Sequence, residues 1–193
     1  SLLKIKKNNS YQEEVIYPSP SLTLGKLEEA NKISYIKSIK KPFILFNSSI
    51  VERKKVENAI LFFKKSNLAD RGFLLCIAGK LHNTKYSEFI KNLCNCEKNI
   101  VLLDYVNEIE KAWLFLNTSL LITTSSFEGF GIPLLDALSI NLPALASDIP
   151  SHKEIKNLTE NNFLNLVNLR KSAEWVKKLN NTKVVGIGDL EIK

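Results

Sequence analysis

The chain has 193 residues, of which 45% are hydrophobic and 24% charged, and its formal net charge is +7. These proportions are those of a soluble globular domain that is long enough to bury a sizeable core. No uninterrupted apolar run approaches the roughly 18 residues of a membrane-spanning helix, and no apolar stretch typical of a secretion signal follows the first residues.

Between residues 42 and 181, short apolar runs alternate with amphipathic stretches. Apolar runs are typical of strands buried on both faces, whereas apolar residues at helical spacing indicate surface helices. We expect strands at residues 42–47, 72–79, 99–106, 119–125, 142–147 and 162–167. We expect helices at residues 51–65, 84–95, 107–118, 132–139, 151–158 and 172–181. The flanking segments are less regular: we expect a loop at 17–21, a lysine-bearing helix within 26–40, and leave the tail from 183 onward unassigned.

This alternation predicts an α/β fold, a Rossmann-like three-layer sandwich with a mostly parallel sheet of about six strands. Residues 1–193 are taken as a single domain. Open sheets of this kind bind ligands outside the carboxyl ends of their strands. We therefore expect the functional edge to be formed by residues 47–49, 79–80, 104–106 and 124–128.

The positive charge suits an anionic partner such as a nucleotide or an anionic membrane surface, although a solvated lysine-rich surface explains it as well. Basic residues do not interleave with aromatic ones, so no nucleic acid is expected. The three cysteines include a C-x-C pair, Cys94 and Cys96, without further ligands nearby. We expect free thiols in the cytoplasm and no metal site. The chain contains no methionine, which favours a piece of a longer or processed protein.

The stretch "SSFEGFGIPLLDAL" (125–138) places Gly129 and Gly131 between a strand and a helix. Glycines there let the backbone approach a ligand, and the proline that follows suits a first helical turn, so an uncapped helix N-terminus is expected to attract phosphate. Glu128 and Asp136 flank this turn and are expected to face the same cleft, where carboxylates can clamp a sugar or ribose diol. Acid–base glycoside hydrolysis by the two acids is an alternative that leaves the phosphate-binding terminus unexplained.

The stretch "LLITTSSFEGFGIPLLDALSINLPALASDIPSHKEI" resembles the group 1 family of retaining glycosyltransferases, which carry a glutamate, seven residues and a second glutamate around Gly-Phe-Gly. Upstream, "FILFNSSIVERKKVENAI" is similar to the family's first strand, loop and helix, and the resemblance covers residues 42–180. It implies a GT-B fold of two Rossmann-like domains. The chain would be the C-terminal, nucleotide-sugar-binding domain, without the N-terminal acceptor domain.

The resemblance implies a role for several residues. Glu128 would contact the donor sugar and Asp136, one methylene shorter than the family's glutamate, the ribose. The backbone of Gly129, Phe130 and Gly131 would meet the sugar and phosphates.

The resemblance also assigns the loops after two other strands. Lys54, with Arg53 beside it, would neutralise the diphosphate. Ser48 stands in the diphosphate loop, where the family often carries Gly-Arg or Gly-Thr. Tyr105 and Val106 would lie near the base.

The implied reaction moves a hexose from a UDP-, GDP- or ADP-sugar to a saccharide or lipid-linked acceptor with retention, as in polysaccharide or lipopolysaccharide biosynthesis. It needs no cofactor and no bound metal in this family. The protein would be cytoplasmic, with peripheral association with the inner membrane face as an option. Alternatives are a non-catalytic module that binds a nucleotide or a partner, and a sugar-nucleotide epimerase. The two histidines, His82 and His152, are given no role.

Overall fold

The computed structural model describes residues 2–7, 10–15, 17–30, 39–159 and 162–183. Six strands form one sheet in the order β5-β4-β3-β6-β7-β8, and every neighbouring pair is parallel. Their bounds are β3 (Phe43–Asn47), β4 (Leu74–Ala78), β5 (Ile100–Asp104), β6 (Leu121–Thr123), β7 (Ala144–Ser147) and β8 (Leu164–Val167). The six predicted strands are confirmed, and this sheet is parallel throughout.

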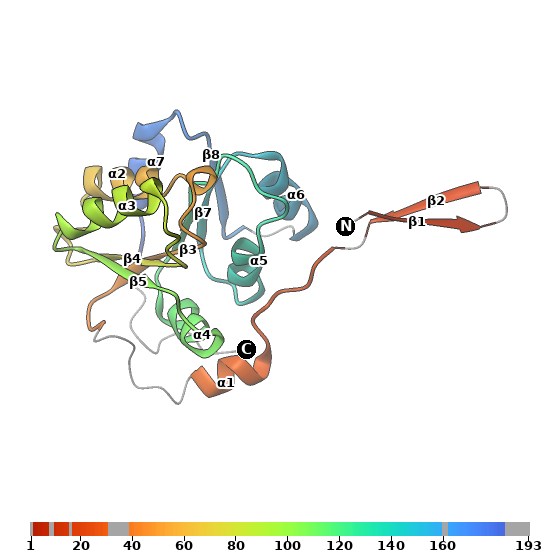
Figure 1. Ribbon diagram of the computed structural model, residues 1–193, viewed down its shortest axis with the longest axis horizontal. Coiled ribbons are helices and arrows are strands. Elements are labelled where there is room, and N and C mark those ends of the chain that lie inside the picture. Colours follow the sequence, from red (N-terminus) through yellow and green to blue (C-terminus); the bar gives the residue numbers. More distant parts are fainter. Residues whose placement is uncertain (1, 8–9, 16, 31–38, 160–161, 184–193) are drawn as a thin grey trace.

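Helices cover both faces of the sheet, which confirms the predicted three layers (Figure 1). One face carries α1 (Leu24–Ala30), α4 (Glu108–Asn117), α5 (Ile132–Ser139) and α6 (Pro150–Thr159). The other carries α2 (Val56–Lys65), α3 (Lys85–Asn95) and α7 (Ser172–Asn180). Successive side chains of a strand point to opposite faces, so Phe43 and Leu45 join the first core while Ile44 and Phe46 join the second.

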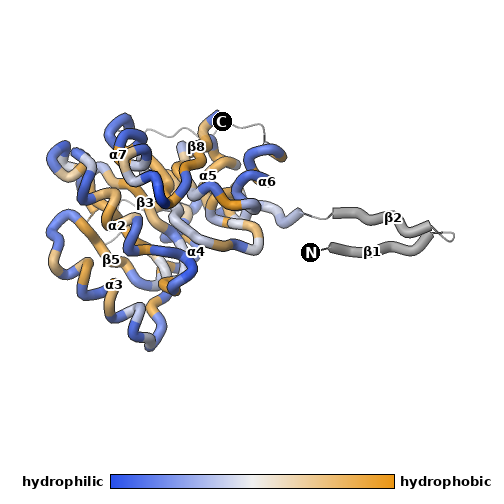
Figure 2. The backbone as a smooth tube through the Cα atoms, turned by 90° about the horizontal axis from the view of Figure 1, so that it is seen from above, coloured by the Kyte–Doolittle hydropathy of each residue, from blue (hydrophilic) through white to orange (hydrophobic). Residues whose placement is uncertain are grey.

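Hydrophobic colouring follows the strands through the middle of the molecule in Figure 2, and hydrophilic colouring marks much of the outer helices. This is the pattern expected of a sheet buried on both faces. None of the helices in the described ranges is both long and apolar enough to cross a membrane.

The predicted helix at residues 51–65 is interrupted. A 3-10 turn, η1 (Glu52–Lys54), comes first, and α2 begins only after Lys55, which adopts a left-handed conformation with φ 51° and ψ 46°. The loop after β6 explains the break, because Thr124 Oγ1 donates a hydrogen bond to the carbonyl of Lys55 at 2.7 Å. Lys54 therefore ends a separate turn and does not open the α-helix.

The N-terminal region contains a hairpin that the sequence reading missed. Strands β1 (Leu2–Lys7) and β2 (Ser10–Val15) pair in antiparallel fashion and lie apart from the main sheet (Figure 1). The expected loop at 17–21 is confirmed as non-regular backbone. Helix α1 covers the start of the expected helix within 26–40; its continuation at 31–38 and the tail from 184 onward lie outside the described residues.

The strand order sets where a ligand site can lie. From β3 the chain proceeds to β4 and β5 on one side, and from β6 it proceeds to β7 and β8 on the other. At this reversal the connections leave β3 and β6 for opposite faces of the sheet, and open α/β sheets bind ligands outside the carboxyl ends of such a pair of strands. The loop after β3 carries Lys54, and the loop after β6 carries Glu128.

Candidate functional site

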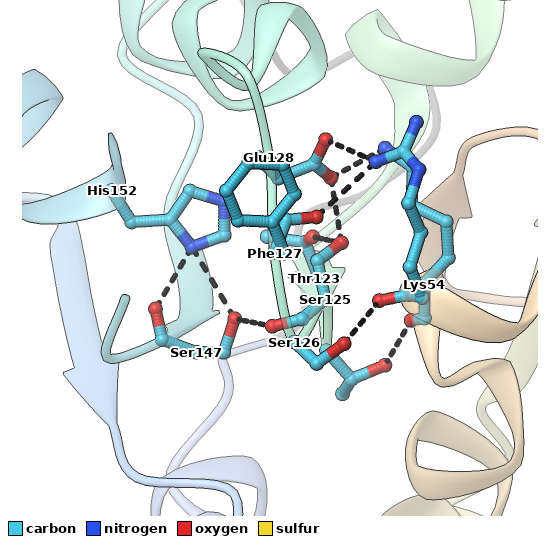
Figure 3. A network of polar contacts seen from close by, with 10 residues as sticks. Lys54, Thr123, Ser125, Ser126, Phe127, Glu128, Ser147 and His152 are labelled. Atoms are coloured by element: carbon cyan, nitrogen blue, oxygen red, sulfur yellow. Dashed lines mark hydrogen bonds and ion pairs between the residues drawn. The ribbon is translucent and has the colours of Figure 1, made fainter. Parts of the chain in front are cut away.

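Two loops meet at the reversal point of the sheet, one following β3 (residues 48–55) and one following β6 (residues 124–131). Both the backbone N–H and the side-chain Oγ of Ser126 donate to the carbonyl oxygen of Arg53, at 2.8 and 3.0 Å. With the bond from Thr124 to Lys55, these contacts fasten the second loop to the first over a sequence separation of about seventy residues. The two loops therefore act as one platform (Figure 3).

Glu128 is the centre of a charged network on this platform. Its carboxylate accepts a hydrogen bond from Lys54 Nζ, one from Arg53 Nη1 at 3.0 Å and one from Ser125 Oγ at 2.6 Å. The side chains of Glu128 and Lys54 are each only 8% exposed, whereas that of Arg53 is half exposed. The predicted residues Glu128, Lys54 and Arg53 are thus brought together, and Ser125 is a partner that the sequence reading missed.

The charge state of Glu128 follows from these contacts. Burial alone would raise its pKa, but the hydrogen bonds from Lys54 and Ser125, the charge of Lys54 and the bond from Arg53 outweigh burial and hold the pKa below its usual range. Burial lowers the pKa of Lys54, and Glu128 offsets that effect only in part. Glu128 is therefore a carboxylate at neutral pH, suited to accept hydrogen bonds from hydroxyl groups rather than to donate a proton.

The glycine turn follows Glu128 directly and leads into α5. Gly129 is exposed, and a Cβ built on it would meet nothing within 4 Å. Gly131 is the N-cap of α5 with φ 111°, a conformation that strongly favours glycine. No side chain of the described residues caps this helix, and its first turn contains Pro133. Pro133 has no N–H, and the N–H groups of Leu134 and Leu135 both donate to the carbonyl of Gly131, at 2.9 and 3.2 Å. The expected attraction for phosphate therefore depends on the helix dipole and on the amides before Pro133, and it remains a prediction.

The ring of His152 packs against the glycine turn, a role that the sequence analysis did not assign. A Cβ on Gly131 would lie 3.3 Å from His152 Cδ2, so the ring packs directly against the turn. His152 Nδ1 lies 2.8 Å from the carbonyl oxygen of Ser147, which can only accept, so Nδ1 carries the hydrogen. Burial lowers the pKa of His152 and keeps the ring neutral, although this hydrogen bond and Glu128 act in the opposite direction. Figure 3 shows the β6 loop between His152 and Lys54.

The expectation that Asp136 opens into the same cleft as Glu128 is wrong. Asp136 is completely buried, and its carboxylate is occupied by residues of an N-terminal segment that crosses α5. We call this segment, residues 17–22, the strap. Its Ser21 donates to Asp136 from both backbone N and Oγ, at 2.5 and 2.7 Å, and Lys111 of α4 forms an ion pair with the same carboxylate at 2.8 Å. A contact between Asp136 and a ribose remains a prediction that requires the strap to move.

The remaining predicted residues lie around the same edge without joining the Glu128 network. Ser48 is half-buried, and its backbone packs closely against Gly79. A Cβ atom added to Gly79 would lie only 1.7 Å from the carbonyl oxygen of Ser48. Tyr105 follows β5 and is 68% exposed. Val106 is buried in the core, so only its backbone can face a ligand. Phe130 is half-buried and packs against the core. Its ring also packs against that of Tyr17, with 5.8 Å between the ring centroids.

No group of three or more His, Cys, Asp or Glu side chains that could hold a metal ion occurs among the described residues. Cys76 and Cys94 are buried, and burial raises the pKa of these thiols to about 12 and about 11. Cys96 is exposed, and none of the three forms a disulfide.

Residues 28–182 match the family model described as glycosyl transferases group 1. No match to the chain was found among curated proteins.

Among solved structures, WaaG, a glycosyltransferase involved in lipopolysaccharide biosynthesis, is 20% identical over 86% of this chain and 44% of its own, with a TM-score of 0.62. The UDP-forming α,α-trehalose-phosphate synthase from Burkholderia xenovorans is 10% identical over 98% of this chain and 48% of its own, with a TM-score of 0.67. The C-terminal domain of the group 1 protein LpcC from Francisella tularensis is 17% identical over 84% of this chain and 83% of that chain, with a TM-score of 0.58.

At these identities the structural likeness shows the fold alone. The chain spans less than half of the WaaG and trehalose-phosphate synthase chains but most of the isolated C-terminal domain, so it resembles a C-terminal domain of the GT-B type. The family match covers well over half of the sequence, in the region that carries both loops of the site. The chain therefore belongs to the group 1 glycosyl transferase family.

Proposed function

We propose that this chain is the donor-binding half of a retaining glycosyltransferase. It would hold a nucleotide diphosphate sugar at the platform formed by the loops after β3 and β6. The donor's hexose would then pass to a saccharide or lipid-linked acceptor with retention of the anomeric configuration.

One observation carries the proposal. The buried ion pair between Lys54 and Glu128 lies where the strand order reverses, directly beside a glycine turn whose first glycine, Gly129, is exposed. A buried pair costs desolvation energy, so its retention at a ligand-binding edge favours a functional role over a purely structural one. Among the similar structures, the trehalose-phosphate synthase is described as UDP-forming, which supports a nucleotide diphosphate as the leaving group.

The site has the chemical groups that departure of a diphosphate needs. As the bond from the anomeric carbon to the diphosphate oxygen breaks, negative charge grows on that oxygen. The Lys54 ammonium, the half-exposed Arg53 guanidinium and the positive end of the α5 dipole can stabilise this charge without rearrangement of solvent. The ionised Glu128 can accept hydrogen bonds from sugar hydroxyls and so fix the ring against the turn.

Donor binding must rearrange the ion pair, because Lys54 has little exposed surface while it faces Glu128. Arg53 is better placed to meet the diphosphate first, since half of its side chain is in solvent. We expect Lys54 to turn from Glu128 towards the phosphates while the sugar hydroxyls take its place at the carboxylate.

Isothermal titration calorimetry of the 193-residue chain with UDP, GDP and ADP tests the proposal. At least one of them is expected to bind, and Lys54→Met and Arg53→Met are each expected to weaken that binding by about tenfold through loss of a charge-assisted contact. Lys64→Met is the matched control, because Lys64 lies near the end of α2 and forms an ion pair with Glu97, away from the site. Absence of binding by all three nucleotides at millimolar concentration in a folded sample rejects the proposal.

A non-catalytic nucleotide-binding module is the second candidate. It is favoured by the contacts of Asp136, because the carboxylate expected to bind the ribose already accepts hydrogen bonds from Ser21 of the strap. The two candidates differ in turnover. Hydrolysis or transfer of a bound nucleotide sugar by a protein that joins this chain to its acceptor-binding part would exclude the non-catalytic module.

A further inference from the structure

His152, in the first turn of α6, is a buried side chain that the proposed function leaves unused. Only 1% of its surface is exposed. Its Nδ1 lies 2.8 Å from the carbonyl oxygen of Ser147 and 3.4 Å from Ser147 Oγ. Because the carbonyl can only accept, Nδ1 carries the hydrogen. Burial lowers the pKa of His152 and favours the neutral ring, so Nε2 keeps a free lone pair.

Nε2 receives no hydrogen bond from the described part of the chain. An acceptor that is left unpaired in a buried place costs free energy, and such an atom calls for an explanation. In the described ranges, Ser151 Oγ is the side-chain atom that is fully enclosed and has no partner. Nε2 therefore retains a small opening to the surface, through which a ligand hydroxyl can reach it.

Nε2 faces the loop that carries Glu128 and the glycine turn. It lies 3.4 Å from the position that a Cβ on Gly131 would take. In Figure 3 one ring nitrogen of His152 makes the dashed contacts to Ser147, and the other faces the loop after β6. The charge of Glu128 acts on the ring as well, since it raises the pKa of His152 against the larger effect of burial. The free nitrogen thus lies on the Glu128 side of the ring.

A chain of hydrogen bonds fixes His152 and Glu128 relative to each other. Ser147 Oγ donates to the carbonyl of Ser125 at 2.5 Å, and Ser125 Oγ donates to the carboxylate of Glu128 at 2.6 Å. Ser125 and Ser147 are both completely buried. With the bond from His152 Nδ1 to Ser147, these contacts hold two acceptors, Nε2 and the carboxylate, in place before a ligand arrives.

We propose that His152 is a specificity-determining residue of the donor site, and that its Nε2 accepts a hydrogen bond from a hydroxyl of the donor sugar beside Glu128. The proposal rests on the proposed function, because it needs a nucleotide sugar at the platform. Two neighbouring acceptors select a ligand that offers several donors. A hexose offers them, whereas an ionised phosphate offers acceptors alone. The described residues include no group of three ligands that would suit a metal ion instead.

The affinity for a nucleotide sugar relative to the bare nucleotide tests the contact. Calorimetry compares UDP-glucose with UDP, GDP-mannose with GDP and ADP-glucose with ADP. His152→Asn keeps an amide hydrogen for the Ser147 carbonyl but has no atom at the position of Nε2. For the pair that binds, we expect this variant to lower the ratio about tenfold and to change the affinity for the bare nucleotide less than about twofold.

Two further variants complete this experiment. His152→Gln returns an acceptor oxygen near the position of Nε2 and should recover part of the ratio. Asn157→Ala is the matched control, because Asn157 is exposed on the same helix, and it should leave the ratio unchanged. An unchanged ratio in His152→Asn overturns the proposal while the proposed function stands. Failure of every nucleotide and nucleotide sugar to bind the wild type rejects the proposed function and the proposal with it.

Nitrogen NMR of the wild-type chain tests the same contact without any substitution. The chain contains only two histidines, so the ring signals of 15N-labelled histidine are simple to separate. We expect His152 to carry its hydrogen on Nδ1 in the free protein. The Nε2 signal should then move more on addition of the nucleotide sugar than on addition of the nucleotide. A hydrogen on Nε2 in the free protein, or an Nε2 signal that responds equally to both ligands, overturns the proposal.

Discussion

Removal of the Glu128 charge should destabilise the protein by a predictable amount. Glu128→Gln keeps the shape of the side chain and its bond from Ser125, but it leaves Lys54 buried without a counter-charge. Breaking a buried pair in this way costs about 3–5 kcal/mol. The contact with the half-exposed Arg53 is screened by solvent and adds at most about 0.5 kcal/mol. Because Lys54 retains a small exposed edge, we expect a loss near the lower limit, about 3 kcal/mol.

Thermal and urea unfolding measure this loss. For a domain of this size each kcal/mol changes Tm by about 2–4 °C, so Glu128→Gln should lower Tm by about 6–12 °C. The double variant Lys54→Met/Glu128→Gln should recover about 1–3 kcal/mol relative to the sum of the single changes, because neither charge is then left unpaired. A Tm within about 2 °C of the wild type for Glu128→Gln, or strictly additive losses, would refute the buried pair as described.

The same pair predicts a dependence on acid. The pKa of Glu128 is lower in the folded state than in the unfolded chain. Its contribution to the free energy of unfolding is therefore complete above the unfolded-state pKa of about 4.3, and it is lost as the pH falls through the lower pKa of the folded state. Glu128→Gln should remove this part of the acid sensitivity.

Further predictions concern the turn, the histidine, the thiols and activity. Gly131→Ala should cost about 1–3 kcal/mol because of its positive φ and contact with His152, whereas Gly129→Ala should change Tm little. Stability should fall as the pH drops below about 6.5, because the unfolded chain protonates His152 before the folded one does, and His152→Gln should flatten that slope in urea titrations. A native thiol titration should modify Cys96 alone, and denaturation should expose the other two; rapid modification of all three in the native protein would contradict their burial. The 193-residue chain by itself should transfer no sugar to a defined acceptor, and measurable transfer would show that it contains a complete active site.

The layered fold was predictable because it depends on local composition. A parallel sheet covered on both faces needs runs that are apolar at every position, and "FILF" or "LLCIA" can hardly be anything else in such a pattern. The edge that carries Glu128 and Lys54 could be named for the same reason. The strand order was not predicted, because right-handed crossovers limit the possible orders without fixing one.

The errors arise from contacts between distant segments. The break at Lys55 depends on hydrogen bonds from the loop after β6, and no local signal marks a lysine for left-handed backbone. The enclosure of Asp136 depends on Ser21, which lies 115 residues away in a segment without regular structure. His152 looked like an isolated residue because its partner, the carbonyl of Ser147, is a backbone group that every sequence offers. The residue pattern along the chain predicts which edge of the sheet is functional. Hydrogen bonds between distant segments decide which carboxylate at that edge is accessible to a ligand.

The central claim is that a nucleotide diphosphate binds at the reversal point of the sheet. Its most direct test is a titration of the 15N-labelled chain with UDP, GDP and ADP, followed by 1H–15N correlation spectra. The account predicts that the largest shifts fall on the amides of Arg53, Lys54 and residues 128–132. A cavity of about 420 Å³ at the opposite edge, lined by Pro143, Asn165 and Lys178 among others, provides the internal comparison. Shifts that gather at that cavity, or spectra unchanged by all three nucleotides, would contradict the account.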